Sequence, residues 1–189
     1  MIKPIFNRYE RKYMLTLKQK TDMIEFLKDH LEYDGFSTDG KPYTIYNIYF
    51  DTHDFSIIRN SIAKPKYKDK LRLRSYTCPV GPEDIVFLEI KKKFEGRVNK
   101  RRVNLKYQEA LDYLQKGVKP HLETYFDQQV FEEIDYFIKI HQANPGVFIS
   151  YERIALVSPH EELRVTFDHQ INFRNHHIDL NRSDGIAIL

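Results

Sequence analysis

Hydrophobic and polar residues alternate strictly along one stretch near the middle of the chain, residues 69–76. Successive side chains of a β-strand point to opposite faces. A strand here therefore buries Leu71 and Leu73 on one face and projects Arg72 and Arg74 from the other. An ordinary amphipathic strand carries charges of mixed sign on its polar face, whereas this one repeats a positive charge. The pattern raises the question of whether these cations face open water or converge on an anion.

The rest of the chain predicts long strands interrupted by a few helices. Alternation and β-branched or aromatic residues predict strands over residues 6–15, 43–51, 69–77, 85–94, 97–105, 147–157 and 163–168. Helical spacing of apolar residues predicts helices over residues 17–31, 107–116 and 125–141, with a short turn or helix at 55–60. A turn at residues 169–170 and a short terminal hairpin, 171–173 with 177–180, complete the predicted elements.

This order of elements indicates an α+β fold built on antiparallel strands. Many of the strands carry apolar groups on one face and ionisable groups on the other. If the sheet closes into a barrel with its charged face inward, the interior becomes a lined tunnel, and about eight strands enclose room for one small ligand. The helices then cover the apolar outer face. We therefore expect a closed antiparallel β-barrel with helices packed outside it.

Composition is typical of one globular domain. The 189 residues are 41% hydrophobic and 30% charged, and the net charge of +3 is too modest to indicate nucleic acid as the partner. Alternation also splits the basic runs at 91–93 and 101–102 between two faces. Cys78 is the only cysteine, which excludes an intramolecular disulfide and multi-cysteine zinc sites and is compatible with the cytoplasmic location that we expect. No apolar run approaches the ~20 residues that span a bilayer, so we expect no transmembrane segment, while a membrane partner stays open.

The polar faces of the predicted strands together carry many more cations than carboxylates. A single basic face is ordinarily just solvated, but four or five strands that repeat the sign favour a bound polyanion. Arginine forks and lysine ammonium groups suit phosphate oxygens, and carboxylates beside a phosphate chain suit Mg²⁺ or Mn²⁺. The chemistry indicated is phosphoryl transfer or hydrolysis. The candidate inward set is Arg8, Glu10, Lys12, Arg72, Arg74, Glu89, Lys91, Lys93, Lys100, Arg102, Arg153, Arg164 and Asp168.

Seven short motifs in register resemble one known family. They are Glu10-Arg-Lys-Tyr13, Tyr49-Phe-Asp51, Lys70-Leu-Arg-Leu-Arg-Ser-Tyr76, Leu88-Glu-Ile-Lys91, Asn99-Lys-Arg-Arg102, Tyr151-Glu-Arg153 and Leu163-Arg-Val-Thr-Phe-Asp168. Glu-x-Lys alone is a weak signal, but the whole series resembles the VTC-type polyphosphate polymerase domain of the triphosphate tunnel metalloenzyme (CYTH-like) superfamily. The resemblance covers essentially the whole chain.

The resemblance implies a barrel tunnel that binds ATP, triphosphate or polyphosphate and transfers the γ-phosphoryl group of ATP to inorganic polyphosphate. It implies a divalent metal, Mn²⁺ or Mg²⁺, held by Glu10 and Glu89. It assigns catalysis to Lys12, Arg72, Arg74 and Lys91. The same four residues, together with Lys93, Lys100, Arg102, Arg153 and Arg164, are the expected phosphate ligands.

Two alternatives stay open at this point. The same cradle would serve a triphosphatase that hydrolyses triphosphate or a nucleoside triphosphate, or a non-catalytic module that binds polyphosphate or inositol phosphates. The resemblance also implies a further Glu-x-Lys strand and a Ser-Lys-aromatic segment beyond Leu189. We therefore expect one tunnel-barrel domain over residues 1–189 that is truncated at its C-terminus relative to the family.

Overall fold

The computed structural model describes residues 10–160, 162–184 and 187–188. Its helices are α1 (Leu17–Leu27), α2 (Ser56–Ile62), α3 (Tyr107–Lys116) and α4 (Tyr125–His141), with a short 3₁₀ turn at Thr38–Gly40. Its strands are β1 (Glu32–Tyr33), β2 (Tyr43–Asp51), β3 (Tyr67–Ser75), β4 (Ile85–Phe94), β5 (Arg97–Lys106), β6 (Asn144–Val157), β7 (Arg164–Arg174) and β8 (Ala187–Ile188). None of the helices described is long and apolar enough to cross a membrane.

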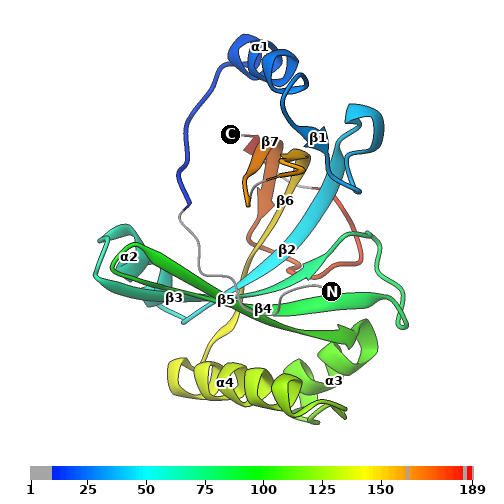
Figure 1. Ribbon diagram of the computed structural model, residues 1–189. Coiled ribbons are helices and arrows are strands. Elements are labelled where there is room, and N and C mark those ends of the chain that lie inside the picture. Colours follow the sequence, from blue (N-terminus) through cyan, green and yellow to red (C-terminus); the bar gives the residue numbers. More distant parts are fainter. Residues whose placement is uncertain (1–9, 161, 185–186, 189) are drawn as a thin grey trace.

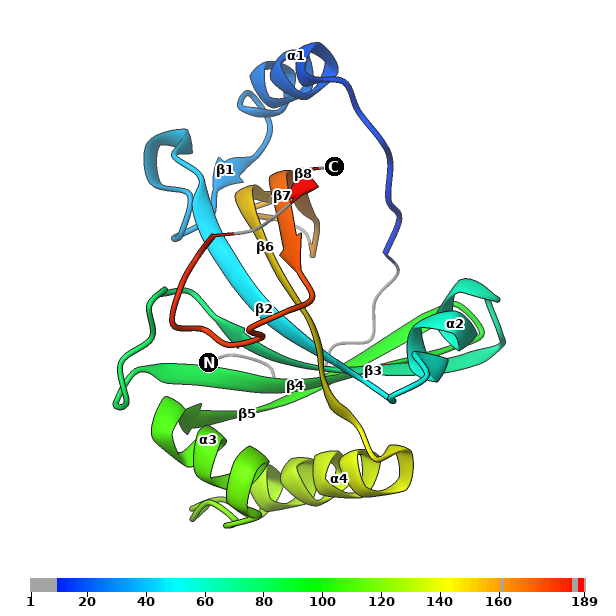
Figure 2. The same ribbon diagram turned by 180° about the vertical axis from the view of Figure 1, so that it is seen from behind.

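The strands form one antiparallel sheet in the order β5-β4-β3-β2-β6-β7-β8, and β1 pairs with β6. The sheet is strongly curled, so that β2, β6 and β7 rise away from β3, β4 and β5 (Figures 1 and 2). Within the described residues no pairing joins β5 to β8, and the sheet is a half-barrel. The expected α+β fold, an antiparallel barrel sheet with helices packed outside, is confirmed in this form.

The buried leucines of β3 lie on the outer face, as the alternation predicts. Leu71 and Leu73 of β3 are fully buried in a core that continues through β4 and β5 to α3 and α4. These two helices lie against β5 and β4 on the outside of the curl (Figure 1). A second, smaller core joins the ends of β6 and β7 to α1 and consists of Leu31, Ile154, Leu156 and Phe167, with Ile24 and Leu27 packed against it. The charged strand residues of the candidate inward set lie on the opposite face of the sheet from both cores.

The predicted strand over residues 6–15 is wrong where the structure describes it. Residues 10–16 form neither helix nor strand, and Glu10 meets the sheet through its side chain, which pairs with Lys91. Arg8 lies outside the described residues. The helix that follows begins where expected, because Thr16 and Gln19 form a capping box, but it ends at Leu27 rather than near residue 31.

The predicted turn at residues 169–170 is also wrong, because β7 continues through it. The pairing of β6 with β7 shifts register between Ser150 and Glu152, and Gln170 takes a φ of 51°. This is a β-bulge, in which one extra residue bends a strand without ending it. A turn and a bulge need the same local backbone conformations, and only the neighbouring strand distinguishes them.

The expected strand over residues 177–180 does not form. Instead the fully buried Arg174 donates hydrogen bonds to the carbonyl oxygens of His177, Asp179, Arg182 and Asp184 and lies over the ring of Phe148. These carbonyls bind one guanidinium rather than a partner strand. The edge of β7 pairs with β8 instead, Asn172 opposite Ile188.

Candidate functional site

Three lysines lie side by side on three neighbouring strands, on the inner face of the sheet. Lys70 of β3 is the register partner of Lys91 of β4, which is in turn the partner of Lys100 of β5. We call these three residues the lysine row. Like charges directly opposite each other on neighbouring strands are destabilising, because their Cβ atoms are only about 5 Å apart. The row therefore calls for a compensating anion.

The next row along the strands contains a buried carboxylate surrounded by cations. Glu89 lies between Arg72 and Arg102 in the register and is only 1% exposed. Its Oε2 accepts a hydrogen bond from Arg72 Nε at 2.6 Å, and Lys100 Nζ lies 2.6 Å from its Oε1. Burial by itself raises the pKa of this carboxyl, but Arg72, Arg74 and Lys100 lower it to about 2. Glu89 is therefore ionised and holds the cations of two rows together.

Polar groups of β2 and β6 hold Arg72 and Arg74 of β3 in place. Arg74 is buried, its Nε donates to Asn47 Oδ1 at 3.1 Å, and its Nη2 donates to the hydroxyl of Tyr151 at 3.3 Å. Arg72 Nη1 donates to the hydroxyl of Tyr49 at 3.1 Å. Both guanidiniums are thus oriented before any ligand binds, which lowers the entropic cost of binding.

Burial and the neighbouring cations lower the pKa of two lysines of the lysine row. Burial, together with the nearby arginines, lowers the pKa of Lys100 to about 8 even though Glu89 opposes the change. Burial also lowers the pKa of Lys70, with Lys68, Lys12 and Lys91 adding to the effect. A group whose charged form is disfavoured in this way gains from an arriving anion.

Arg153 and Arg164, on β6 and β7, each have a carboxylate partner of their own, whereas Arg72 and Lys100 share Glu89. Arg153 forms a two-pronged pair with Asp168, Nε to Oδ1 at 2.6 Å and Nη2 to Oδ2 at 2.7 Å. Arg164 Nη2 lies 2.5 Å from Asp34 Oδ2 and 3.3 Å from the hydroxyl of Tyr43. These two predicted phosphate ligands lie on the inner face, but a phosphate has to compete with protein carboxylates for them.

The remaining predicted residues lie near the lysine row. Glu10 pairs with Lys91, and Lys12, which is 84% exposed, lies 3.6 Å from Glu10 Oε1. Lys93 is the register partner of Lys68, one row beyond the lysine row. The structure therefore brings Arg72, Arg74, Glu89, Lys91, Lys100 and Arg102 together, while Lys12 is linked to them through Glu10.

The two predicted metal ligands have different surroundings. In the described part of the chain no group of three or more His, Cys, Asp or Glu side chains could hold a metal. A magnesium ion that binds phosphates commonly takes only one or two protein carboxylates, and Glu10, which is 40% exposed beside Lys91, fits that role. Glu89 would have to exchange Arg72 and Lys100 for the metal, so its assignment stays a prediction.

The structure adds residues that the analysis of the sequence did not select. Lys70 is in phase with Arg72 on β3, so its spacing was a usable signal. Asn47 and Tyr49 hold Arg74 and Arg72 from the neighbouring strand. Nothing local in the sequence shows that β2 lies beside β3, so these two contacts could be found only from the pairing.

Comparison with known proteins agrees with this geometry. The model of the VTC domain family matches residues 7–187. A crystal structure from Bacillus halodurans, described as a "putative adenylate cyclase", superposes with a TM-score of 0.52 at 20% identity, covering 89% of this chain and 72% of that one. No curated protein matches the chain.

The fold is the triphosphate tunnel (CYTH-like) fold. The match to the family model spans nearly the whole chain. The charged inner face of the half-barrel corresponds to what such a tunnel requires. The chain belongs to the VTC domain family.

Proposed function

We propose that this protein binds triphosphate or polyphosphate along the inner face of its sheet and transfers the γ-phosphoryl group of ATP to inorganic polyphosphate. The observation that supports the proposal most strongly is the lysine row, Lys70, Lys91 and Lys100, set beside Arg72 and Arg74. Glu89 and Glu10 together neutralise only part of this charge. A chain of phosphates supplies the missing negative charges at regular spacing, which a single small anion does not.

Catalysis of this phosphoryl transfer depends on aligning the two substrates and neutralising their negative charge more than on proton transfer. The bond between the γ-phosphorus and the β–γ bridging oxygen of ATP breaks, a bond from a terminal polyphosphate oxygen to that phosphorus forms, and ADP leaves. Because the attacking oxygen is already ionised near pH 7, it needs no general base. The arginines and lysines bind the equatorial and bridging oxygens on which negative charge develops.

The protein side of this step is prepared in advance. Arg72 and Arg74 are held by Tyr49, Asn47 and Tyr151, so their donors need little reorganisation. A divalent metal held by Glu10 would add charge neutralisation on the phosphates. Lys91, now paired with Glu10, would turn to a phosphate oxygen when the metal takes its carboxylate partner.

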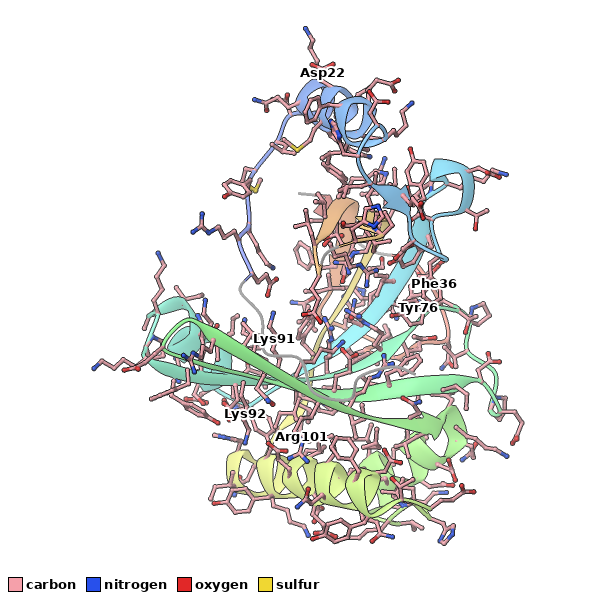
Figure 3. All side chains as sticks on the ribbon, viewed as in Figure 1. Asp22, Phe36, Tyr76, Lys91, Lys92 and Arg101 are labelled. Atoms are coloured by element: carbon pink, nitrogen blue, oxygen red, sulfur yellow. The ribbon has the colours of Figure 1, made fainter. Side chains whose placement is uncertain are left out.

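Two neighbouring lysines provide a matched test. Lys91 lies on the inner face, and Lys92 lies on the outer face, where it pairs with Glu133 at 2.6 Å (Figure 3). Calorimetry with inorganic triphosphate should show an affinity about 10- to 100-fold weaker for Lys91→Gln, because a charge-assisted hydrogen bond is worth roughly 1.5–3 kcal/mol. Lys92→Gln removes the same charge and should bind as the wild type does.

The products then separate the activities. Wild-type protein with ATP and Mn²⁺ or Mg²⁺ should make long polyphosphate, seen on a gel, and Lys91→Gln should make much less. Orthophosphate alone would show transfer to water and identify a triphosphatase. Tight binding without metal-dependent turnover would identify a binding module. Wild-type protein with no affinity for triphosphate, or equal losses in the two variants, would reject the proposal.

A further inference from the structure

Four aromatic rings gather at one end of the inner face. Phe36 and Tyr76 stack nearly parallel, with centroids 5.5 Å apart and an angle of 11° between the rings. Tyr43 lies 5.4 Å from Phe36, and Phe87 meets Tyr76 edge-on at 5.6 Å. Figure 3 shows Phe36 and Tyr76 side by side at the edge of the curled sheet. We call these four residues the aromatic platform.

The aromatic platform lies directly next to the arginines of the site. Tyr76 directly follows the last residue of β3, and the guanidinium carbon of Arg74 is 6.0 Å from its ring centroid. The corresponding carbon of Arg102 is 4.7 Å from the ring of Phe87. Phe87 and Lys91 both lie on β4. At about 3.3 Å per residue along a strand, their Cα atoms are roughly 13 Å apart.

The inner face therefore has a polarity along its length. Aromatic rings occupy one end, Arg72 and Arg74 the middle, and the lysine row the other end, with Lys93 opposite Lys68 beyond it. A nucleoside triphosphate has the same order of parts: a flat aromatic base, a linker, and then phosphates. The order of aromatic rings and then cations along the face matches the order of base and then phosphates.

Phe36 is exposed although its loop is well anchored. Its side chain is 62% exposed, while Asp34 Oδ1 accepts hydrogen bonds from the backbone N–H groups of Phe36 and Ser37. Ser37 is fully buried, and its hydroxyl accepts a hydrogen bond from the N–H of Ala155. The ring is thus held rigidly at the surface of the inner face rather than packed into a core. Such a ring is suited to stack on a ligand.

We infer that Phe36, supported by Tyr76, stacks on the base of the bound nucleoside triphosphate and sets the direction in which the nucleotide lies. This inference rests on the proposed function. It places the γ-phosphate toward the lysine row and the acceptor polyphosphate at the end marked by Lys68 and Lys93. Stacking is tolerant of the base, since every base has a π-face, so GTP should bind about as well as ATP.

The test compares two ligands that differ only in the nucleoside. Phe36→Ala should weaken the affinity for ATP, measured by calorimetry, about 5- to 150-fold, the range expected for loss of one base–aromatic stack. Its affinity for inorganic triphosphate should stay within about twofold of the wild type. Phe36→Trp should restore ATP binding. Tyr136→Ala, which removes a ring of α4 that is 66% exposed, is the matched control and should change neither affinity.

Each outcome decides the inference. Equal losses for ATP and triphosphate would show that Phe36 only supports the fold of the loop and would overturn it. Unchanged ATP affinity in Phe36→Ala would overturn it as well, while leaving the proposed function intact. A wild-type protein that binds neither ligand overturns the proposed function, and the base site with it.

Discussion

The two faces of β4 and β5 carry similar cations with different surroundings. On the outer face, Lys92 and Arg101 share one carboxylate, Glu133 of α4, each at 2.6 Å. Arg101 also lies over the ring of Phe126, 5.2 Å from its centroid. On the inner face, Lys91 and Lys100 are opposite each other and Lys70 extends the row. Figure 3 shows Lys91 on one side of the sheet and Lys92 and Arg101 on the other, toward α4.

The difference separates a structural role from a binding role. The outer cations are paired by a helix and help to attach it to the sheet. The inner cations are held in place by Glu89, Tyr49 and Asn47, but their total charge exceeds that of the carboxylates near them. Residue type does not distinguish Lys91 from Lys92. The face of the sheet does distinguish them, because among the described residues α3 and α4 cover the outer face of β4 and β5 and no helix covers the inner face (Figure 1).

The largest expected effect is on stability, and it concerns Glu89 on the inner face and Glu133 on the outer face. Glu89→Gln should lower the free energy of unfolding by about 3–5 kcal/mol, because it leaves buried cations without their partner. Glu133→Gln should cost only about 1 kcal/mol, since its pairs are partly exposed. Urea titration of both variants measures the difference.

Triphosphate supplies a second readout for the same pair. By binding the folded state it should raise the midpoint of unfolding of the wild type and of Glu133→Gln by the same amount, and that of Glu89→Gln by more, because it replaces a lost negative charge only on the inner face. Equal destabilisation by the two substitutions would contradict the difference between the faces.

The pH dependence of binding should report Lys100. Its pKa of about 8 means that the ammonium loses its proton above pH 8 in the free protein. Affinity for triphosphate should then fall with rising pH, by at most about tenfold per pH unit for one proton. The free energy of unfolding of the ligand-free protein should instead rise between pH 8 and 10.5, because in that range the unfolded chain binds more protons than the folded one.

Lys100→Arg is the control, since arginine keeps its charge throughout this range. It should flatten the fall in affinity above pH 8 while leaving binding at pH 7 largely intact. A decline that is as steep in Lys100→Arg as in the wild type would assign the titration to another group.

The smallest effect tests the half of the inner face that β6 and β7 form, where Arg153 and Arg164 each have a carboxylate of their own. Asp168→Asn removes the carboxylate that competes with phosphate for Arg153. The affinity for triphosphate should rise by up to about fivefold, in line with the worth of a partly exposed ion pair. Weaker binding in Asp168→Asn, measured by calorimetry, would show that Asp168 orients Arg153 for the ligand rather than competing for it.

Local patterns in the chain predicted most of the elements and the faces of the strands. Alternation placed Leu71 and Leu73 outward and Arg72 and Arg74 on the opposite face, and the strand over residues 85–94 has the bounds expected. The same local reasoning failed at residues 169–170, where a bulge has the appearance of a turn. It failed again at 177–180, where Arg174 binds the backbone carbonyls.

By itself the sequence determined which residues share a strand face and that the shared charge is positive, because side-chain period is a property of the chain over a few residues. Only the tertiary structure decided which cations are neutralised. Asp34 reaches Arg164 across 130 positions, and Asn47 and Tyr49 reach Arg74 and Arg72 from the next strand. It alone also placed Phe36 beside Tyr76. Strand order and register join distant segments, and no local period encodes them.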